Sequence, residues 1–174
     1  DRVWIIDPLD GTQEYSEFDR ADWAVHIALW ERKDADGKPS DEGSITQAAV
    51  ALPAYNMTLS THQLPKTPDR HEGKPRLVVS RNRATREAVI VAEALDCDVA
   101  RLGSAGAKTM AVVLGEVDIY VHAGGMYQWD SAAPIAVAAA AGLFTSRIDG
   151  TPLIYNRRDA WLPDLVVCQQ HLAQ

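Results

Sequence analysis

The hexapeptide Asp7-Pro8-Leu9-Asp10-Gly11-Thr12 places two carboxylates three residues apart, directly after the apolar run at residues 3–6. That run is rich in β-branched residues and predicts a buried strand that ends in a tight turn. Pro8 fixes one backbone angle and Gly11 permits a sharp bend, so the two carboxylates can converge. Converging carboxylates repel each other unless a cation or a proton lies between them. We therefore expect a strand, a turn and a charged site at the start of the chain.

Two carboxylates in one turn have a specific candidate partner. Mg²⁺ prefers oxygen ligands, binds one or two carboxylates and keeps water for a substrate phosphate. The backbone N–H groups of Gly11 and Thr12 lie where a helix can begin, and such groups bind anions. The alternative is an ordinary turn with a solvated acid at each end, because short motifs often match by chance.

Composition excludes several classes of protein. The chain has 174 residues, 47% of them hydrophobic, and a net charge of −7, which argues against a nucleic-acid polymer as partner. No apolar run is long enough to span a bilayer, so we expect no membrane partner. Residues 1–4 do not resemble a signal peptide, and Cys97 and Cys168 form no disulfide framework or zinc motif. We expect a cytoplasmic protein with reduced thiols.

The first part of the chain predicts an antiparallel sheet. Residues 23–30 and 44–52 are expected strands joined by a solvated turn, and residues 57–61 are a third strand. Residues 63–75 contain three prolines and many charges, which is typical of a linker. We therefore expect an N-terminal subdomain at residues 1–65 and a C-terminal α/β subdomain at residues 76–174.

The second part of the chain alternates strands with helices, which predicts helices packed on a sheet. Strands are expected at residues 76–79, 99–102, 119–121 and 165–168. Helices are expected at residues 84–95, around residues 107–114 with an end at Gly115, and at residues 130–141 with an end at Gly142. The last helix is apolar on nearly every face, so it should lie between two layers.

Trp129-Asp130-Ser131-Ala132-Ala133 opens that last helix. An aspartate at such a position is most often an N-cap. The same carboxylate can be a third metal ligand, because it has two oxygens, with Trp129 as a wall beside it. Both roles remain open at this point.

Together the two motifs resemble the inositol monophosphatase family of Mg²⁺-dependent, lithium-sensitive phosphatases, and the resemblance extends over essentially the whole chain. It implies a layered αβαβα sugar-phosphatase-like sandwich, here without its N-terminal helical layer and the glutamate ligand that precedes the first motif. It also implies two or three Mg²⁺ ions at Asp7, Asp10, Asp130 and the Leu9 carbonyl, with Thr12 positioning the attacking water. The implied substrate-binding residues are Asp10, Gly11, Thr12, Gly103, Ser104, Ala105, Lys108 and Asp130.

Three features resemble the 3′(2′),5′-bisphosphate nucleotidase (CysQ-type) branch of this family. Gln13-Glu14-Tyr15 follows the first motif as it does in that branch, and Lys108 stands where the branch has a lysine. Ala123 replaces a glutamate that inositol monophosphatases use to hold ring hydroxyls. The implied reaction is hydrolysis of 3′-phosphoadenosine 5′-phosphate to AMP in sulfur assimilation. A cation at Lys108 could pair with a second phosphate, although a solvated lysine is equally compatible with the pattern.

Other interpretations stay open on the sequence. The same metals would serve an inositol-1-phosphate or fructose-1,6-bisphosphate phosphatase, and the fold could also be a non-catalytic binding or regulatory module. The partner is expected to be a phosphorylated nucleotide or sugar phosphate, and a homodimer is possible. His26 is expected on the polar face of its strand, His71 in solvent and His122 in local hydrogen bonds. Tyr127 and Trp129 are expected to pack rather than to stack on a base.

Overall fold

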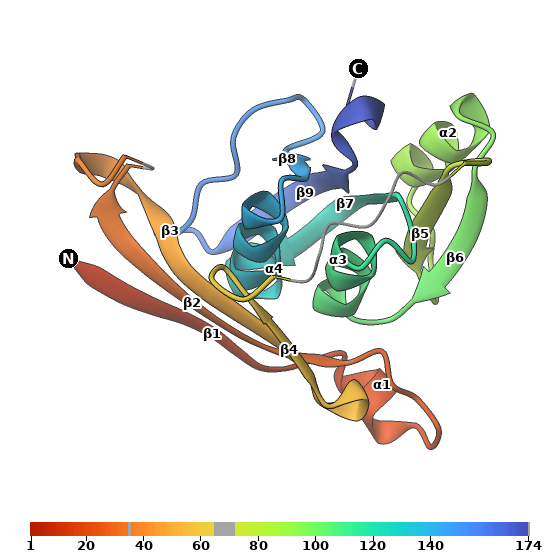
Figure 1. Cartoon of the computed structure of the whole chain (residues 1–174), viewed down its shortest axis with the longest axis horizontal. Helices are drawn as coiled ribbons and strands as arrows, with labels where there is room; N and C mark the ends of the chain where they lie inside the picture. The colour runs from red at the N-terminus through yellow and green to blue at the C-terminus, as the bar shows by residue number, and fades with distance from the viewer. Residues whose placement is uncertain (35, 65–71, 174) are drawn as a thin grey trace.

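The computed structural model describes residues 1–34, 36–64 and 72–173, which form two sheets and the helices around them (Figure 1). The first sheet is antiparallel, in the order β1 (Arg2–Asp10), β2 (Ala24–Lys33), β3 (Pro39–Leu52) and β4 (Met57–Ser60). The second is mixed, in the order β6 (Asp98–Leu102), β5 (Arg76–Ser80), β7 (Ile119–Tyr127), β9 (Trp161–Cys168) and β8 (Phe144–Ser146). The helices are α1 (Thr12–Ser16), α2 (Arg86–Ala94), α3 (Ala105–Val113) and α4 (Gln128–Ala140), with single 3₁₀ turns η1 (Pro53–Tyr55) and η2 (Gln170–Leu172).

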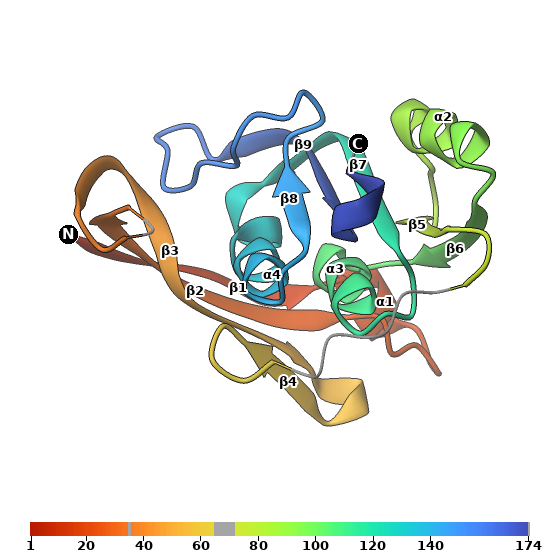
Figure 2. The same ribbon diagram turned by 45° about the horizontal axis from the view of Figure 1, so that its top comes forward.

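Helices α3 and α4 lie between the two sheets, and α2 covers the other face of the second sheet (Figure 2). Alternation along the strands produces this layering. Val78 and Tyr120 point into the core around α3 and α4, whereas Leu77 and Ile119 belong to the separate cluster under α2. Helix α4 contacts strands of both sheets, which confirms the expectation that it lies between layers.

The outer face of the first sheet is apolar and open. Strand β1 directs Val3 and Ile5 toward the core, while Trp4, Ile6 and Ile27 are exposed on the sheet. Among the described residues, nothing buries these three side chains, which are all at least 40% exposed. The expectation that residues 3–6 form a buried strand therefore holds for one face of β1 only: Val3 and Ile5 pack against the core, whereas Trp4 and Ile6 are exposed.

Several strands are longer than the sequence pattern predicts. The tight turn expected after residue 6 does not occur, because β1 continues through Asp10 and the turn comes at Gly11, whose φ is +85°. Strands β2, β3, β7 and β9 also extend beyond their predicted ends. Helix α1 begins at Thr12, where the sequence allowed a helix to start, whereas β8 is too short to show a period and had no signal in the sequence.

The proposed division at residues 1–65 and 76–174 stays a prediction. The two sheets lie on either side of this break in the sequence, but α3 contacts strands of both. Residues 65–71 of the expected linker, including His71, lie outside the described residues. Among the helices that the structure describes, none is long and apolar enough to cross a membrane.

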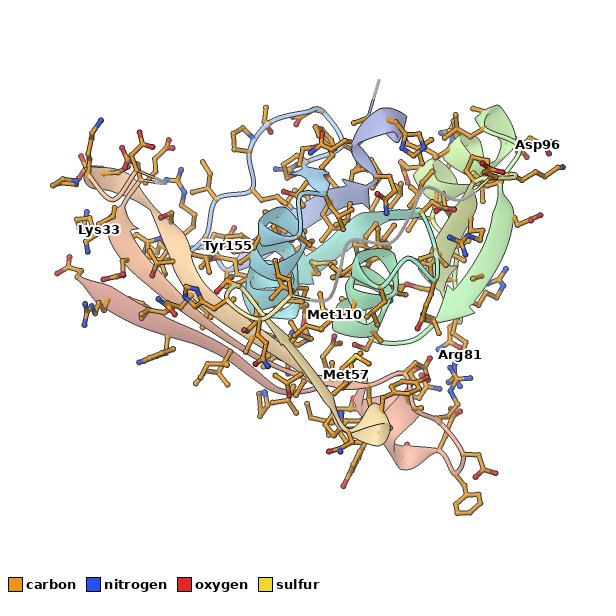
Figure 3. The ribbon with its side chains drawn as sticks, viewed as in Figure 1. Lys33, Met57, Arg81, Asp96, Met110 and Tyr155 are labelled. Atoms are coloured by element: carbon orange, nitrogen blue, oxygen red, sulfur yellow. The ribbon has the colours of Figure 1, made fainter. Side chains whose placement is uncertain are left out.

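The buried position of α3 predicts a matched difference between two methionines. Met110 on α3 is fully buried, whereas Met57 on β4 is 37% exposed (Figure 3). We expect Met110→Ala to lower the free energy of unfolding by about 2–5 kcal/mol, because it leaves a cavity between the sheets. Met57→Ala should cost less than about 1 kcal/mol, since solvent fills the vacated space. Urea unfolding checks both values, and equal losses in the two variants would contradict the packing described above.

Candidate active site

Asp7 and Asp10 lie at the end of β1, where the pairing with β2 shifts register. Asp7 is paired with His26 and Asp10 with Ala24, so the residues between the two acids stand outside the regular ladder. Asp7 Oδ1 accepts a hydrogen bond from the Leu9 N–H at 3.0 Å. An irregularity of this kind bends a strand and re-aims its side chains.

Asp10 is anchored through one of its two oxygens. Oδ2 accepts hydrogen bonds from the Ser104 hydroxyl and, at 2.7 Å, from the Gly106 N–H. His26 Nε2 lies 3.2 Å from the same oxygen. Burial alone would raise the pKa of Asp10, but His26 and these donors outweigh burial and lower it. Asp10 therefore stays ionised, and its other oxygen accepts no hydrogen bond from the described residues.

His26 is fully buried beneath this site, which corrects the prediction that it lies on a polar strand face. Its Nδ1 is 3.3 Å from the Trp129 carbonyl oxygen, so the ring bridges Asp10 and the start of α4. A Cβ at position 106 would lie 2.0 Å from His26 Nε2, so only glycine leaves room for the ring. The alternation in residues 23–30 failed as a guide because both faces of β2 carry apolar residues.

Asp130 joins the other two aspartates from the start of α4. It is the third residue of the helix rather than its N-cap, and its Oδ2 accepts a hydrogen bond from the Tyr127 N–H at 2.7 Å. Burial, followed by the charges of Asp10 and Asp7, raises the pKa of Asp130 to about 6 despite that bond. Burial and the Asp10 charge also raise the pKa of Asp7, although Asp7 is close enough to Asp130 to share a hydrogen bond.

This donor set fits a hard divalent cation. Asp7 and Asp130 face each other with raised pKa values, which a cation between them would reverse. Across residues 1–34, 36–64 and 72–173, no group of three or more acidic, histidine or cysteine side chains is placed so that it could hold a metal ion by itself. Mg²⁺ does not require such a group, because it takes one or two carboxylates and completes its octahedron with water and phosphate oxygens.

The loop before α3 is fixed to the first sheet. Asp22 accepts the Gly103 N–H at 2.6 Å through its side chain and the Ser104 N–H at 3.2 Å through its carbonyl. The Ser104 hydroxyl also accepts the Ala107 N–H at 2.9 Å and so caps α3. Ser104 therefore holds Asp10 and the helix together, and its hydroxyl is buried.

Lys108 is buried, which excludes the solvated side chain that the sequence allowed. Its ammonium donates to the Gly103 carbonyl and lies 5.3 Å from the centre of the Tyr120 ring. Burial lowers the pKa of Lys108 to about 8, although the charges of Asp10, Glu14, Asp22 and Asp130 oppose this shift. The lysine therefore supplies a desolvated positive charge beside the aspartates.

Arg81 connects α1 with the second sheet and was not found from the sequence. Arg81 is labelled in Figure 3. Its guanidinium donates to Glu17 at 2.6 Å and lies 3.4 Å from buried Glu14. Its backbone N–H donates to the Leu102 carbonyl at 3.0 Å. Glu14 belongs to the segment after the first motif, but nothing in its local sequence shows that its partner is distant.

These groups surround a pocket of about 380 Å³. Of the predicted site residues, Asp10, Gly103, Ala105, Lys108 and Asp130 line it, while Asp7 touches Asp130 from beside the pocket. Gly11, Thr12 and Ser104 are not part of its wall. The wall also contains residues that the sequence did not assign to the site: Ser80, Tyr120, His122, Gly125, Met126, Tyr127 and Trp161.

A second pocket of about 550 Å³ adjoins the first and shares Ser80 and His122 with it. Its wall carries Arg83 and Arg86 around the start of α2, together with Glu87. Within the described residues, neither arginine forms an ion pair with a carboxylate. His122 Nε2 lies 3.0 Å from the Gly125 carbonyl oxygen, which confirms the expected local hydrogen bond.

Comparison with known proteins identifies relatives for this arrangement. The family model described as the inositol monophosphatase family matches residues 1–173. The 3′-phosphoadenosine 5′-phosphate phosphatase of Mycobacterium bovis is 49% identical over 99% of this chain and 64% of its own length. The 3′(2′),5′-bisphosphate nucleotidase CysQ of Escherichia coli K12 is 31% identical over 92% of this chain and 65% of its own length.

The fold has the same relatives. The crystal structure of CysQ from Bacteroides thetaiotaomicron superposes with a TM-score of 0.76 at 22% identity, covering 98% of this chain and 70% of that one. This likeness confirms the predicted layered α/β fold class. The chain spans about two thirds of the length of the curated relatives that it matches.

The raised pKa of Asp130 predicts how metal-free protein responds to pH. The carboxyl titrates at about 6 in the folded protein and near ~4 in an unfolded chain. Between these values the folded protein holds a proton that the unfolded chain has lost, so the free energy of unfolding falls as pH rises. Asparagine does not titrate, so the Asp130→Asn variant does not lose stability in this way. Its free energy of unfolding, compared with that of the unsubstituted protein, should therefore rise between about pH 4 and pH 7.

Urea unfolding in metal-free buffer at several pH values measures this difference. Asp98→Asn, an exposed change on β6, is the matched control and should show no such trend. Parallel pH profiles for Asp130→Asn and the unsubstituted protein would contradict the burial of this carboxyl.

Proposed function

The chain belongs to the inositol monophosphatase family, and on that premise we propose that it is a Mg²⁺-dependent phosphomonoesterase. The proposed reaction is hydrolysis of the 3′-phosphate of 3′-phosphoadenosine 5′-phosphate, which gives AMP and phosphate. One observation carries this proposal. Three aspartates from two distant segments meet beside one pocket that also receives the ammonium of Lys108.

Asp7, Asp10, Asp130 and the Leu9 carbonyl are the proposed metal ligands. When bound, Mg²⁺ would activate a water molecule and neutralise charge on the phosphate and the leaving oxygen. Asp10 is ready for this role because its Oδ2 is already held by protein donors. Asp7 and Asp130 would give up the protons that their raised pKa values favour in the absence of a cation.

The remaining residues position the reactants. Thr12 begins α1 directly after the left-handed Gly11, and its hydroxyl is proposed to orient the attacking water. The N–H groups of Gly11 and Thr12 are proposed to hold phosphate oxygens. Gly103, Ala105 and Lys108 are proposed to contact the rest of the substrate from the pocket wall, and Ser104 is proposed to support them from behind that wall. Their loop is held in place because Asp22 binds the Gly103 N–H and Asp10 binds the Ser104 hydroxyl. A rigid loop keeps the substrate in a reactive orientation.

The adjoining arginine pocket favours a substrate with a second anionic group. Arg83 and Arg86 form no ion pair with a carboxylate of the described residues, and they line one pocket together with Ser80 and His122. Ala123 lines the same pocket, so no carboxylate at that position repels an anion. A bisphosphate fits this distribution of charge better than inositol monophosphate does. The relatives from Mycobacterium bovis and Escherichia coli, a 3′-phosphoadenosine 5′-phosphate phosphatase and a 3′(2′),5′-bisphosphate nucleotidase, support this choice.

The binding of two or three Mg²⁺ ions, inhibition by Li⁺ and a role in sulfur assimilation are proposed from the family resemblance alone. A cytoplasmic location is proposed from the sequence composition, and a homodimer stays an expectation. The partner is expected to be a small phosphorylated molecule, a nucleotide or a sugar phosphate.

The metal-ligand assignment predicts a large catalytic loss. In the full-length protein with Mg²⁺, Asp130→Asn should lower kcat for 3′-phosphoadenosine 5′-phosphate at least ~10²-fold, as expected for loss of a central electrostatic contributor. Asp98→Asn is the control and should keep kcat within about twofold, because surface changes have little effect. Phosphate release and circular dichroism are measured together. A folded Asp130→Asn variant with a nearly unchanged kcat would refute the assignment.

The second-phosphate assignment predicts a selective change in KM. Arg83→Gln should raise KM for 3′-phosphoadenosine 5′-phosphate by roughly 3- to 10-fold, the loss expected for one exposed charged contact. It should change KM much less for adenosine 3′-phosphate, which lacks the 5′-phosphate. Arg158→Gln, an exposed arginine outside both pockets, is the control. An equal rise of KM for both substrates would mean that Arg83 does not bind the second phosphate. A preference of the unsubstituted protein for inositol 1-phosphate would overturn the nucleotide assignment.

A further inference from the structure

Two half-exposed aromatic side chains form one side of the candidate pocket. Trp161 on β9 is 48% exposed and Tyr127 on β7 is 47% exposed, and both line the pocket that contains Asp10 and Asp130. They are paired across the two antiparallel strands, so they lie on the same face of the sheet. Their ring centres are 5.6 Å apart and their planes meet at 84°. We call this pair the aromatic wall.

The backbone of β7 is shaped to receive the Trp161 ring. The pairing of β7 with β9 shifts register between Ala123 and Met126, across Gly124 and Gly125. Gly125 has a φ of +88°, and a Cβ added there would lie 1.7 Å from Trp161 Cζ2. The ring therefore lies directly against this glycine. Any larger residue at position 125 would displace the Trp161 ring, so the irregular pairing and the glycine together fix the position of the indole.

Packing does not account for Trp161 in the way that it accounts for the other tryptophans near the core. Trp30 is 3% exposed inside the core. Trp129 is stacked against the Tyr127 ring, with centres 4.5 Å apart and an 11° angle between the planes. Trp161 meets Tyr127 at right angles instead, and about half of its surface stays open beside a strongly charged pocket. An exposed apolar surface in such a position marks a site for a ligand.

We propose that Trp161, seated on Gly125 and flanked by Tyr127, stacks on the nucleobase of the substrate and so selects nucleotides over phosphorylated sugars. This inference rests on the proposed phosphatase function. An indole ring presents a flat, polarisable face to any base, whereas inositol phosphates and sugar phosphates carry no aromatic group to stack on it. The aspartates and Lys108 would bind the phosphate on the remaining walls of the same pocket.

Kinetics of Trp161→Ala and Trp161→Phe in the full-length protein test the proposal. Trp161→Ala should raise KM for 3′-phosphoadenosine 5′-phosphate by roughly 5- to 100-fold, the range for loss of one base–aromatic stack, while kcat changes far less. The ratio of kcat/KM for this nucleotide to that for inositol 1-phosphate should fall by the same factor. Trp161→Phe should restore most of the ratio, since a phenyl ring still stacks. Trp4→Ala, on the outer face of the first sheet, is the control and should leave the ratio unchanged.

Fluorescence gives an independent measurement without turnover. AMP should quench the tryptophan emission of the unsubstituted protein, and Trp161→Phe should remove most of that quenching. Inositol 1-phosphate should not quench the emission of either protein. A folded Trp161→Ala variant with unchanged KM and unchanged quenching would overturn the stacking role. Failure of the unsubstituted protein to release phosphate from any of these substrates with Mg²⁺ would instead overturn the proposed function.

Discussion

The carboxylate of Asp10 joins the parts of the molecule that make the site. One oxygen binds the Ser104 hydroxyl and the Gly106 N–H at the start of α3, and it also faces His26 of β2. A buried carboxylate without such donors would be costly, so the loop, the helix and the strand depend on one another for their positions. His26 extends the link to the Trp129 carbonyl, next to Asp130. Distant segments therefore converge on one acid.

The other two aspartates, Asp7 and Asp130, have too few hydrogen-bond donors and cations around them to stabilise their negative charge. Asp7 and Asp130 have raised pKa values because burial and neighbouring acids oppose their ionisation. Positive charge is supplied by buried Lys108, which lines the same pocket, and by Arg83 of the adjoining pocket. A divalent cation between the acids would neutralise their negative charge, and an anionic substrate would neutralise the positive charge of Lys108 and Arg83. That division suits phosphate transfer to water.

The motifs at residues 7–12 and 129–133 were enough to predict the family, the layered fold and the acids of the site, because strand and helix signals lay between them in the expected order. The ends of β1 and β7 were predicted too short because both strands continue through irregular pairing, which weakens the alternation that a sequence pattern detects. The predicted site roles themselves remain proposals. His26, Arg81 and Trp161 were missed, because their partners are far away in the sequence.

The sequence by itself determined the residue types and their order: two acids after a strand, a third acid at an apolar helix, a lysine between them and an excess of negative charge. Only the tertiary structure decided which of these groups are buried, which share a hydrogen bond and which face the pocket. Packing α3 and α4 between two sheets removes water from Lys108 and His26, and it closes the distance between Asp7 and Asp130. Desolvation and proximity set the charge of an ionisable group, and both arise only when distant segments pack together.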